Sequence, residues 1–476
     1  MTNTAEYDDY DAMGLAELVR SGDVRPQELL EEAIKRTEQI NPKINAVVQK
    51  HYDEAEAAIR AGLPDGPFTG VPFLLKDLNI LLEGTVTSMG SAMFKDYMAT
   101  YNSTLTNRYI KSGLVIFGKS ASPEFGALPV TETQLFGATR NPWDLDRTPG
   151  GSSGGASASV AAGIIPMANA SDGGGSIRIP AACTGLVGLK PTRGRTAMGP
   201  TIGEGWGGQS ISHVVSKTVR DSAAMLDATT GPEPGDPYSP PYFDGLYLNE
   251  VEKPPGKLTV ALIPEKIGNG SYSPEIRKAL EETASLMVEL GHDVEEATPE
   301  VDGYALQFAS TTLLAANLAL KVTQQEEETG QPLREGDLEP STLALIKLGR
   351  SIDGEACAKA SQINHMSGRI MGRFHENYDI VLSPTLSTLP VPIGYFSDGD
   401  LGEKIGEFMA NTSMFNQTGQ PSISLPLAWS ENKLPIGIMF SSAFGQDDQL
   451  IRLAAQLEQA RPWSNRRAPH HAANLP

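Results

Sequence analysis

The most informative part of the sequence is residues 149–195, which read PGGSSGGASASVAAGIIPMANASDGGGSIRIPAACTGLVGLKPTRGR. Two glycine-serine segments, Gly150 to Gly155 and Ser171 to Ser176, lie on either side of a run of small residues. Clustered glycines indicate a backbone in unusual conformations or in close contact with another group. A serine that follows three glycines can share its loop with several N–H groups that point to one place and bind an anion or oxyanion. A single such loop is more often a flexible turn, but two of them favour a functional site.

A serine nucleophile needs a base, and histidine is the usual one. The seven histidines are His51, His213, His292, His365, His375, His470 and His471. None lies in a glycine-serine-rich or strand-end setting. We expect His51, His292 and His375 at exposed helix ends, and the last two in an irregular tail.

Lys76 is the alternative base. It directly follows the apolar run Val71 to Leu75 and precedes Asp77. A lysine that closes a buried strand is costly unless it is used or paired, and burial would lower its pKa so that the neutral amine can accept a proton. From this feature alone, a strand-end lysine paired with Asp77 stays an open interpretation.

Two other motif matches lack the context that they require. Residues 151–155 fit the nucleophile elbow G-x-S-x-G with Ser153 as the nucleophile, but a loop precedes them where the motif needs a strand. Residues 203–208 fit G-x-G-x-x-G, but no strand is expected before them and no helix after them. The sequence has no H-E-x-x-H, C-x-x-C or P-loop motif. We therefore expect no metal and no cofactor.

Together these segments resemble a known family. The run from Pro149 to Arg195 resembles the signature of the amidase-signature hydrolases, and Gly70 to Asp77 is similar to the lysine segment of that family. Further similar segments are 118–119, 123–125, 139–143, 415–421 and 434–437. The resemblance covers nearly the whole chain and is weakest between about 230 and 375.

The resemblance implies a catalytic role for three residues. Ser176 would be the acylating nucleophile, and Ser152, held in a cis peptide, would relay its proton to Lys76.

The resemblance also implies a set of supporting residues. The backbone N–H groups of the oxyanion hole would belong to Gly173, Gly174, Gly175 and Ser176. Asp172 and Arg178 would brace this loop as an ion pair. Ser153 would support the site by packing.

Several segments are similar in sequence to the nylon-oligomer-degrading members of the family. They are LVRSGD, GVPFLLKDL, GATRNPW and GLKPTRGR. Aryl-acyl and general amidases share much of the sequence of these segments. The amidotransferase subunit that makes Gln-tRNA typically has Gln after the signature arginine, whereas this chain has Ile179, which argues against that role.

The resemblance implies an amidohydrolase that cleaves the C–N bond of a small, mostly neutral amide through an acyl-enzyme. The substrate would be a cyclic or linear oligoamide, or an aryl or alkyl amide. An esterase or urethanase with the same residues is the alternative, and a catalytically silent binding module is a more distant one. Apolar residues that could line the pocket are Phe308, Leu313, Leu314, Leu318, Leu320 and residues 343–346, although each of these more often packs in a core.

The fold class expected is α/β. Short apolar runs such as 71–75 and 114–117 alternate with Gly/Ser/Pro-rich loops, which is typical of buried strands in such a core. The resemblance implies a large central mixed β-sheet flanked by helices on both faces. We expect one domain over residues 1–476. Its expected parts are N-terminal helices at about 10–62, a signature core at about 68–200 and a variable helical region at about 303–376.

Composition limits the partners. The formal net charge of −20 argues against a nucleic-acid partner and against anionic membranes. No basic and apolar leader is seen and no long apolar run suggests a membrane span, so we expect a cytoplasmic enzyme that acts on a small-molecule amide. Cys183 and Cys357 are too few for a disulfide framework or a zinc site. A homodimer stays open.

Overall fold

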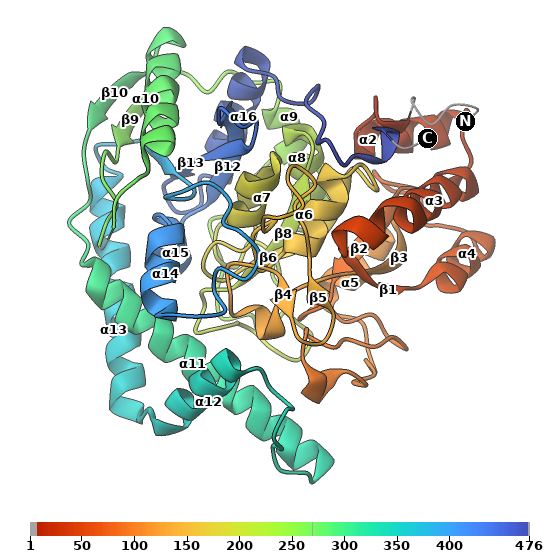
Figure 1. Cartoon of the computed structure of the whole chain (residues 1–476). Helices are drawn as coiled ribbons and strands as arrows, with labels where there is room; N and C mark the ends of the chain where they lie inside the picture. The colour runs from red at the N-terminus through yellow and green to blue at the C-terminus, as the bar shows by residue number, and fades with distance from the viewer. Residues whose placement is uncertain (1–6, 269, 475–476) are drawn as a thin grey trace.

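The computed structural model describes residues 7–268 and 270–474, and its centre is an eight-stranded mixed sheet (Figure 1). The strand order is β10-β9-β11-β13-β12-β7-β8-β6. The bounds are β6 (Met167–Asp172), β7 (Val187–Lys190), β8 (Ile211–Ser216), β9 (Thr259–Leu262), β10 (Asp293–Glu296), β11 (Ile380–Pro384), β12 (Ser422–Trp429) and β13 (Pro435–Ser442). β9 runs parallel to both β10 and β11, and the other neighbours are antiparallel. The α/β class with a large mixed sheet is thus confirmed.

The described residues form fifteen helices. Their bounds are α2 (Ala12–Ser21), α3 (Pro26–Ile44), α4 (Tyr52–Ala61), α5 (Thr104–Lys111), α6 (Gly154–Ala161), α7 (Arg178–Thr184), α8 (Val219–Thr229), α9 (Tyr247–Glu250), α10 (Pro274–Glu289), α11 (Gly303–Thr329), α12 (Pro340–Ser351), α13 (Gly354–Phe374), α14 (Leu401–Phe408), α15 (Thr412–Thr418) and α16 (Asp447–Ala460). Short 3₁₀ turns are η1 (Ala92–Phe94), η2 (Glu124–Gly126) and η3 (Ala472–Asn474), and a small hairpin is formed by β4 (Glu132–Thr133) and β5 (Gly137–Ala138). Proline occupies the first turn of α3, α10 and α12, where no N–H is needed for the helix.

Apolar side chains cover both faces of the sheet. In β11, Ile380 and Leu382 belong to a cluster that also contains residues of α10 and α16. Val381, which points to the opposite face, packs in another cluster with Met371 of α13 and Phe415 of α15. Alternate strand residues point to opposite faces, so helices pack on both sides of the sheet.

A second, three-stranded sheet carries the lysine segment. Its order is β1-β3-β2, with bounds β1 (Val47–Lys50), β2 (Pro72–Lys76) and β3 (Val115–Ser120). The side chain of Asn169 in β6 accepts a hydrogen bond from the backbone N–H of Lys76 at 3.1 Å, so the end of β2 lies beside the edge strand of the large sheet. This junction brings the lysine to the glycine-serine segments.

Small residues let α6 and α7 approach the sheets closely. A Cβ on Gly155 would lie 2.2 Å from the backbone nitrogen of Ala121, and one on Gly188 would lie 2.6 Å from the Cβ of Ala181. Such distances are far inside van der Waals contact, so larger side chains would push α6 and α7 away. The low side-chain volume between 149 and 195 therefore sets where the loop before α7 lies.

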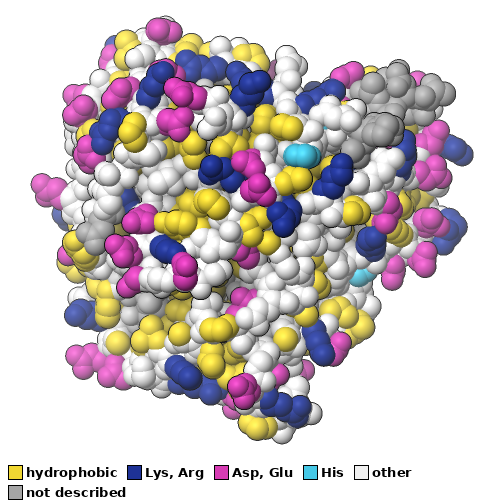
Figure 2. All heavy atoms as spheres, in the orientation of Figure 1, with side chains coloured by type: hydrophobic (Ala, Val, Ile, Leu, Met, Phe, Trp, Pro, Cys, Tyr) yellow, Lys and Arg dark blue, Asp and Glu magenta, His cyan; other side chains and the backbone are white. Residues whose placement is uncertain are grey.

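The helices α11, α12 and α13 lie on one side of the molecule, away from α2, α3 and α4 (Figure 1). Among the described residues, α11 is the one helix whose length and apolar composition would suffice to cross a membrane. Its buried side chains, however, pack against its neighbours: Ala309 and Leu313 contact Ala360 of α13, and Leu318 packs with Ile346 of α12. On the face shown in Figure 2, Lys and Arg are interspersed with Asp and Glu and form no single basic patch.

Candidate active site

Lys76 lies at the centre of a cluster of serines. It ends β2 with its side chain fully buried, and Nζ lies 2.8 Å from Oγ of Ser152, 3.0 Å from Oγ of Ser153 and 3.0 Å from Oγ of Ser171. Asp77 points elsewhere and accepts hydrogen bonds from other side chains, including Ser88. The interpretation of Lys76 as the ion-pair partner of Asp77 is therefore wrong.

The surroundings of Lys76 favour its neutral form. Burial lowers the pKa of Lys76 from its ordinary value of 10.5 to about 7, and the negative charge of Asp172 acts in the opposite direction. Within the described residues no carboxylate lies within ion-pair distance of Nζ. An amine with a pKa near 7 can accept a proton at neutral pH, which a surface lysine cannot do to a useful extent.

Ser152 and Ser153 stand just before α6 and both face the lysine. The Gly151–Ser152 peptide bond is cis, and Ser152 is almost fully buried. Oγ of Ser153 donates to the carbonyl oxygen of Ser171 at 3.2 Å and does not line the cavity described below. Ser153 therefore has no access to a substrate, which argues against the nucleophile-elbow interpretation.

Ser176, unlike Ser152 and Ser153, lines a cavity. It follows Gly175 in the loop before α7 and lines the cavity together with Gly173 and Gly174. Within the part of the chain that the structure describes, its Oγ makes no hydrogen bond, so the hydroxyl can rotate toward a ligand in the cavity. Among the candidate residues it is the hydroxyl that a substrate can reach.

Asp172 organises the glycine loop. Its carboxylate accepts bonds from Nε and Nη2 of Arg178, each at 3.0 Å, from Nδ2 of Asn416 at 2.8 Å and from the N–H of Ile177 at 3.1 Å. Burial alone would raise its pKa, but the ion pair with Arg178 and the bond from Asn416 hold the pKa of Asp172 far below its ordinary value. The ion pair expected between Asp172 and Arg178 is present, with both side chains fully buried.

One residue of the expected oxyanion hole has another partner. The N–H of Gly175 donates to Oδ1 of Asp172 at 2.7 Å, so this donor is engaged inside the loop. The expectation that Gly175 donates to the oxyanion is therefore corrected, because one N–H cannot serve the carboxylate and the substrate with full strength. The N–H groups of Gly173, Gly174 and Ser176 have no such competing bond among the described residues.

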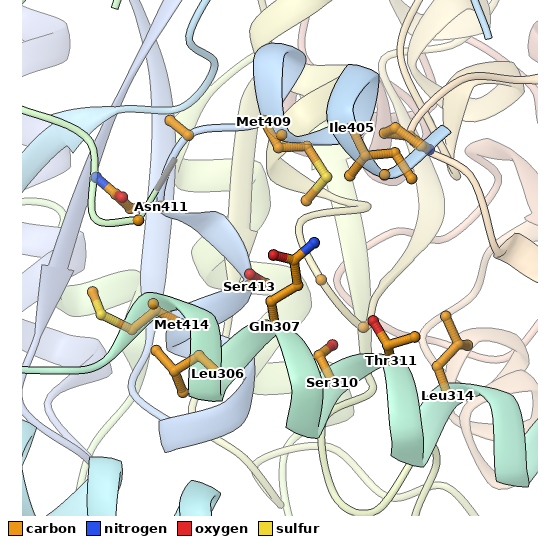
Figure 3. Close-up of a pocket in the computed structure, with 18 of the residues that line it drawn as sticks. Leu306, Gln307, Ser310, Thr311, Leu314, Ile405, Met409, Asn411, Ser413 and Met414 are labelled. Atoms are coloured by element: carbon orange, nitrogen blue, oxygen red, sulfur yellow. The ribbon is translucent and has the colours of Figure 1, made fainter. Parts of the chain in front are cut away.

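The cavity next to Ser176 has a volume of about 390 Å³. One wall is α11, from which Leu306, Gln307, Ser310, Thr311 and Leu314 face the cavity. Figure 3 shows Gln307 projecting from α11 toward Ile405 and Met409, which form the wall across from it. Of the apolar residues expected in the pocket, Leu314 and Leu345 line it. Phe308 and Leu320 are instead partly exposed, and Leu313 and Leu318 are buried in helix packing.

Sequence reasoning assigned no role to several residues that shape the site. Ser171 contacts Lys76, although only the next residue, Asp172, was assigned a role from the sequence. Thr412 donates to the carbonyl oxygen of Gly174 at 2.8 Å, and the ring of Trp206 would meet a Cβ on Gly173 at 2.5 Å. Residues 415–421 matched the family, but the match does not reveal that they fold back onto the glycine loop.

The histidines are placed differently from what the sequence indicates. His51 and His292 are buried rather than exposed, and His471, near the C-terminus, is buried as well. None of the seven lines the cavity that contains Ser176. Among the described residues, no group of three or more His, Cys, Asp or Glu side chains is arranged to hold a metal ion.

Comparison with known proteins agrees with this geometry. The family model described as Amidase matches residues 28–451. The 6-aminohexanoate-cyclic-dimer hydrolase of Paenarthrobacter ureafaciens is 36% identical over 474 residues, 96% of each chain, and the acylamidase of Rhodococcus erythropolis is 31% identical over 469 residues, again 96% of each. The solved structure of 6-aminohexanoate cyclic dimer hydrolase superposes with a TM-score of 0.91 at 34% identity, covering 97% of this chain and 99% of that one.

The similarity to nylon-oligomer-degrading members that four segments indicate is thereby confirmed. The match extends over both sheets and the helical side of the molecule, since nearly the whole chain is covered. The chain belongs to the amidase family, the amidase-signature hydrolases that act on amide C–N bonds.

Proposed function

We propose that the protein hydrolyses a small amide through an acyl-enzyme, with Ser176 as nucleophile, Ser152 as proton relay and Lys76 as base. The observation that carries this proposal is the 2.8 Å contact between Nζ of Lys76 and Oγ of Ser152 in a fully buried cluster. The pKa of Lys76, lowered to about 7 by burial, gives the amine a neutral form at the pH of the cell.

In the first step Oγ of Ser176 attacks the amide carbonyl carbon. Its proton passes to Oγ of Ser152 while the proton of Ser152 passes to Nζ of Lys76. The C–N bond then breaks, and the leaving amine takes up a proton that returns from Lys76 through Ser152. Water attacks the resulting ester in the same way, and the carboxylic acid leaves.

The developing oxyanion needs donors that are already in place. We assign this role to the N–H groups of Gly173, Gly174 and Ser176. The engaged N–H of Gly175 keeps the loop in shape, since it ties the loop to Asp172. A pre-set loop does not have to reorganise when the charge develops, which is the main source of stabilisation in such sites.

The proposed substrate is neutral around the scissile bond. The cavity that Ser176 lines also contains glycines, apolar side chains such as Ile179 and Leu314, the indole of Trp206 and neutral polar side chains. The cavity volume of about 390 Å³ lies within the range of about 300–1,000 Å³ that is typical of small-molecule sites. The named relatives act on cyclic amides of aminohexanoate and on acyl amides, which fits a substrate of methylene chains or rings.

A screen over cyclic amides, anilides, primary amides and carbamates tests this function, with a matched ester beside each amide. We expect amide hydrolysis that disappears in Ser176→Ala, and covalent labelling of Ser176 by a serine-directed phosphonylating reagent. Faster turnover of the carbamate or ester members alone would establish the urethanase or esterase alternative. A label on Ser153, with Ser176→Ala still active, would overturn the mechanism.

A further inference from the structure

The cavity at Ser176 contains one charged side chain, Lys266. All other residues of the described part of the chain that line this cavity are apolar, glycine or neutral polar. Lys266 lies in the loop between β9 and α10, far along the chain from the candidate triad. None of the sequence motifs includes it. A lone cation in such a cavity needs an explanation, because desolvating a charge without a counter-ion is unfavourable.

The hydrogen bonding of Lys266 leaves most of its capacity unused. Nζ donates to the carbonyl oxygen of Gly406 in the last turn of α14. Among the described residues no carboxylate forms an ion pair with it, and the neighbouring Glu265 pairs with Arg277 at 2.8 Å. An ammonium group has three N–H donors, so at least one can point to a ligand.

The position of Lys266 is fixed relative to the glycine loop. The backbone N–H of Ile267 donates to Oδ1 of Asn411 at 3.1 Å. The next residue, Thr412, donates to the carbonyl oxygen of Gly174 at 2.8 Å. The same short segment therefore holds the loop of Lys266 and the loop that precedes Ser176, and a rigid substrate can contact both.

The charge state of Lys266 suits an anion. Partial burial lowers its pKa to about 8, so the ammonium form still predominates at pH 7. A bond to the last carbonyl groups of a helix stabilises a cation, but it does not neutralise it. A carboxylate is the ligand that would do so, and a charge-assisted bond of this kind is stronger than one between neutral groups.

We propose that Lys266 is a specificity-determining residue that binds a carboxylate of the substrate, separated by a spacer from the bond that Ser176 attacks. The proposal rests on the proposed function and deepens it: the substrate is neutral at the scissile bond and anionic at its other end. Amides of dicarboxylic acids, linear oligoamides and N-acyl ω-amino acids have this chemistry. The expectation of a mostly neutral substrate is refined accordingly.

Two pairs of substrates test the proposal. The acyl-side pair is the mono-4-nitroanilide of adipic acid and the same anilide with the free carboxylate converted to a primary amide. The amine-side pair is N-hexanoyl-6-aminohexanoate and its primary amide. We expect wild-type kcat/KM to favour the carboxylate in at least one pair by about 10- to 100-fold, the size of one charge-assisted hydrogen bond.

In Lys266→Met this preference should disappear through a higher KM for the carboxylate, with little change in kcat, because the contact is made equally in the ground and transition states. Lys266→Arg should keep part of it. The neutral members should be hydrolysed by Lys266→Met at near wild-type rates. Lys43→Met is the matched control, since it removes the same charge from an exposed position on α3 and should leave the preference intact.

Three results would overturn the role of Lys266. One is a wild type without preference in either pair; another is a preference that survives in Lys266→Met. The third is an equal loss for both members of each pair, which would show that Lys266 only caps α14. Binding of the two carboxylates to Ser176→Ala, compared with the double variant that also carries Lys266→Met, tests the carboxylate contact without turnover. If the wild type hydrolyses no member of either pair and no amide of the screen described above while this binding difference persists, the proposed function fails and the role of Lys266 stands.

Discussion

The pH dependence of turnover is the sharpest consequence of the buried lysine. In the proposed mechanism Lys76 acts in its neutral form, so activity should rise as pH rises through its pKa. Burial places this pKa at about 7, whereas a solvated lysine titrates at about 10.5. Turnover should therefore fall as pH drops below about 7 and reach a plateau above it.

The size of the effect follows from the titration. With a pKa of about 7, roughly a tenth of Lys76 is neutral at pH 6 and roughly nine tenths at pH 8, so kcat/KM should rise about tenfold between these values. A lysine that kept its ordinary pKa would have a neutral fraction at pH 7 that is lower by about three orders of magnitude. Lys76→Arg should be inactive at every pH, because a guanidinium does not deprotonate in this range.

The assay is the release of 4-nitroaniline from a neutral anilide between pH 5.5 and 9.5, recorded as kcat/KM. Two other groups have pKa values shifted to about 7, and they serve as controls. Burial lowers the pKa of Lys190 to about 7, but its Nζ donates to the carbonyl oxygen of Pro191 and not to a serine. Burial raises the pKa of Glu458 to about 7. Lys190→Met and Glu458→Gln should keep the inflection where it is, even if their rates are lower.

Two outcomes would refute this reasoning. A profile that is flat from pH 5.5 to 9.5 would mean that the base does not titrate near 7. An inflection that vanishes in Lys190→Met, or substantial activity in Lys76→Arg, would remove Lys76 from the role of base.

Three further predictions concern the glycine loop. Ser176→Ala should lower kcat by about 10⁴ or more while the circular dichroism spectrum and the melting temperature stay close to wild type, because the side chain is small and unbonded. Gly175→Ala should lower both activity and thermal stability, since Gly175 has φ of 136° and its Cβ would lie 2.7 Å from two side chains. Gly174→Ala is the control: the nearest atom to its Cβ would be 3.9 Å away, so it should keep wild-type stability in the same melting experiment. Asp172→Asn should lower the free energy of unfolding in urea by about 3–5 kcal/mol, because it leaves the guanidinium of Arg178 buried without its counter-charge; a loss below about 1 kcal/mol would show that the pair is dispensable.

Much of the architecture could be predicted from local sequence. The apolar runs that end at Leu75 and Phe117 lie in β2 and β3. Their type was readable because a buried strand needs a short continuous apolar run between glycines and prolines. The strands β6 and β8 do not follow from the sequence pattern, since β6 consists mostly of Ala, Ser and Asn residues and the apolar residues of β8 are interrupted by Ser212 and His213.

The sequence by itself determined which residues are candidates for chemistry. Lys76 and Ser176 could be selected because their signals are local: a lysine that closes a buried strand, and a serine after three glycines. The choice of Ser152 rather than Ser153 came from the resemblance to the family. A run of glycines affects the local backbone independently of the rest of the chain, so the motif can be recognised from the sequence without knowledge of the fold.

The tertiary structure alone decided how these candidates are connected. It placed Ser171 against Lys76 and gave the N–H of Gly175 to Asp172, because a donor bonds to the partner that folding brings nearest. The tertiary structure also decided which face of α11 lines the cavity. An apolar helix that packs on several sides has no sequence pattern that indicates which face contacts the substrate. Lys266 entered the cavity in the same way: contacts between segments distant in sequence depend on the packing of the whole chain, and no local pattern records them.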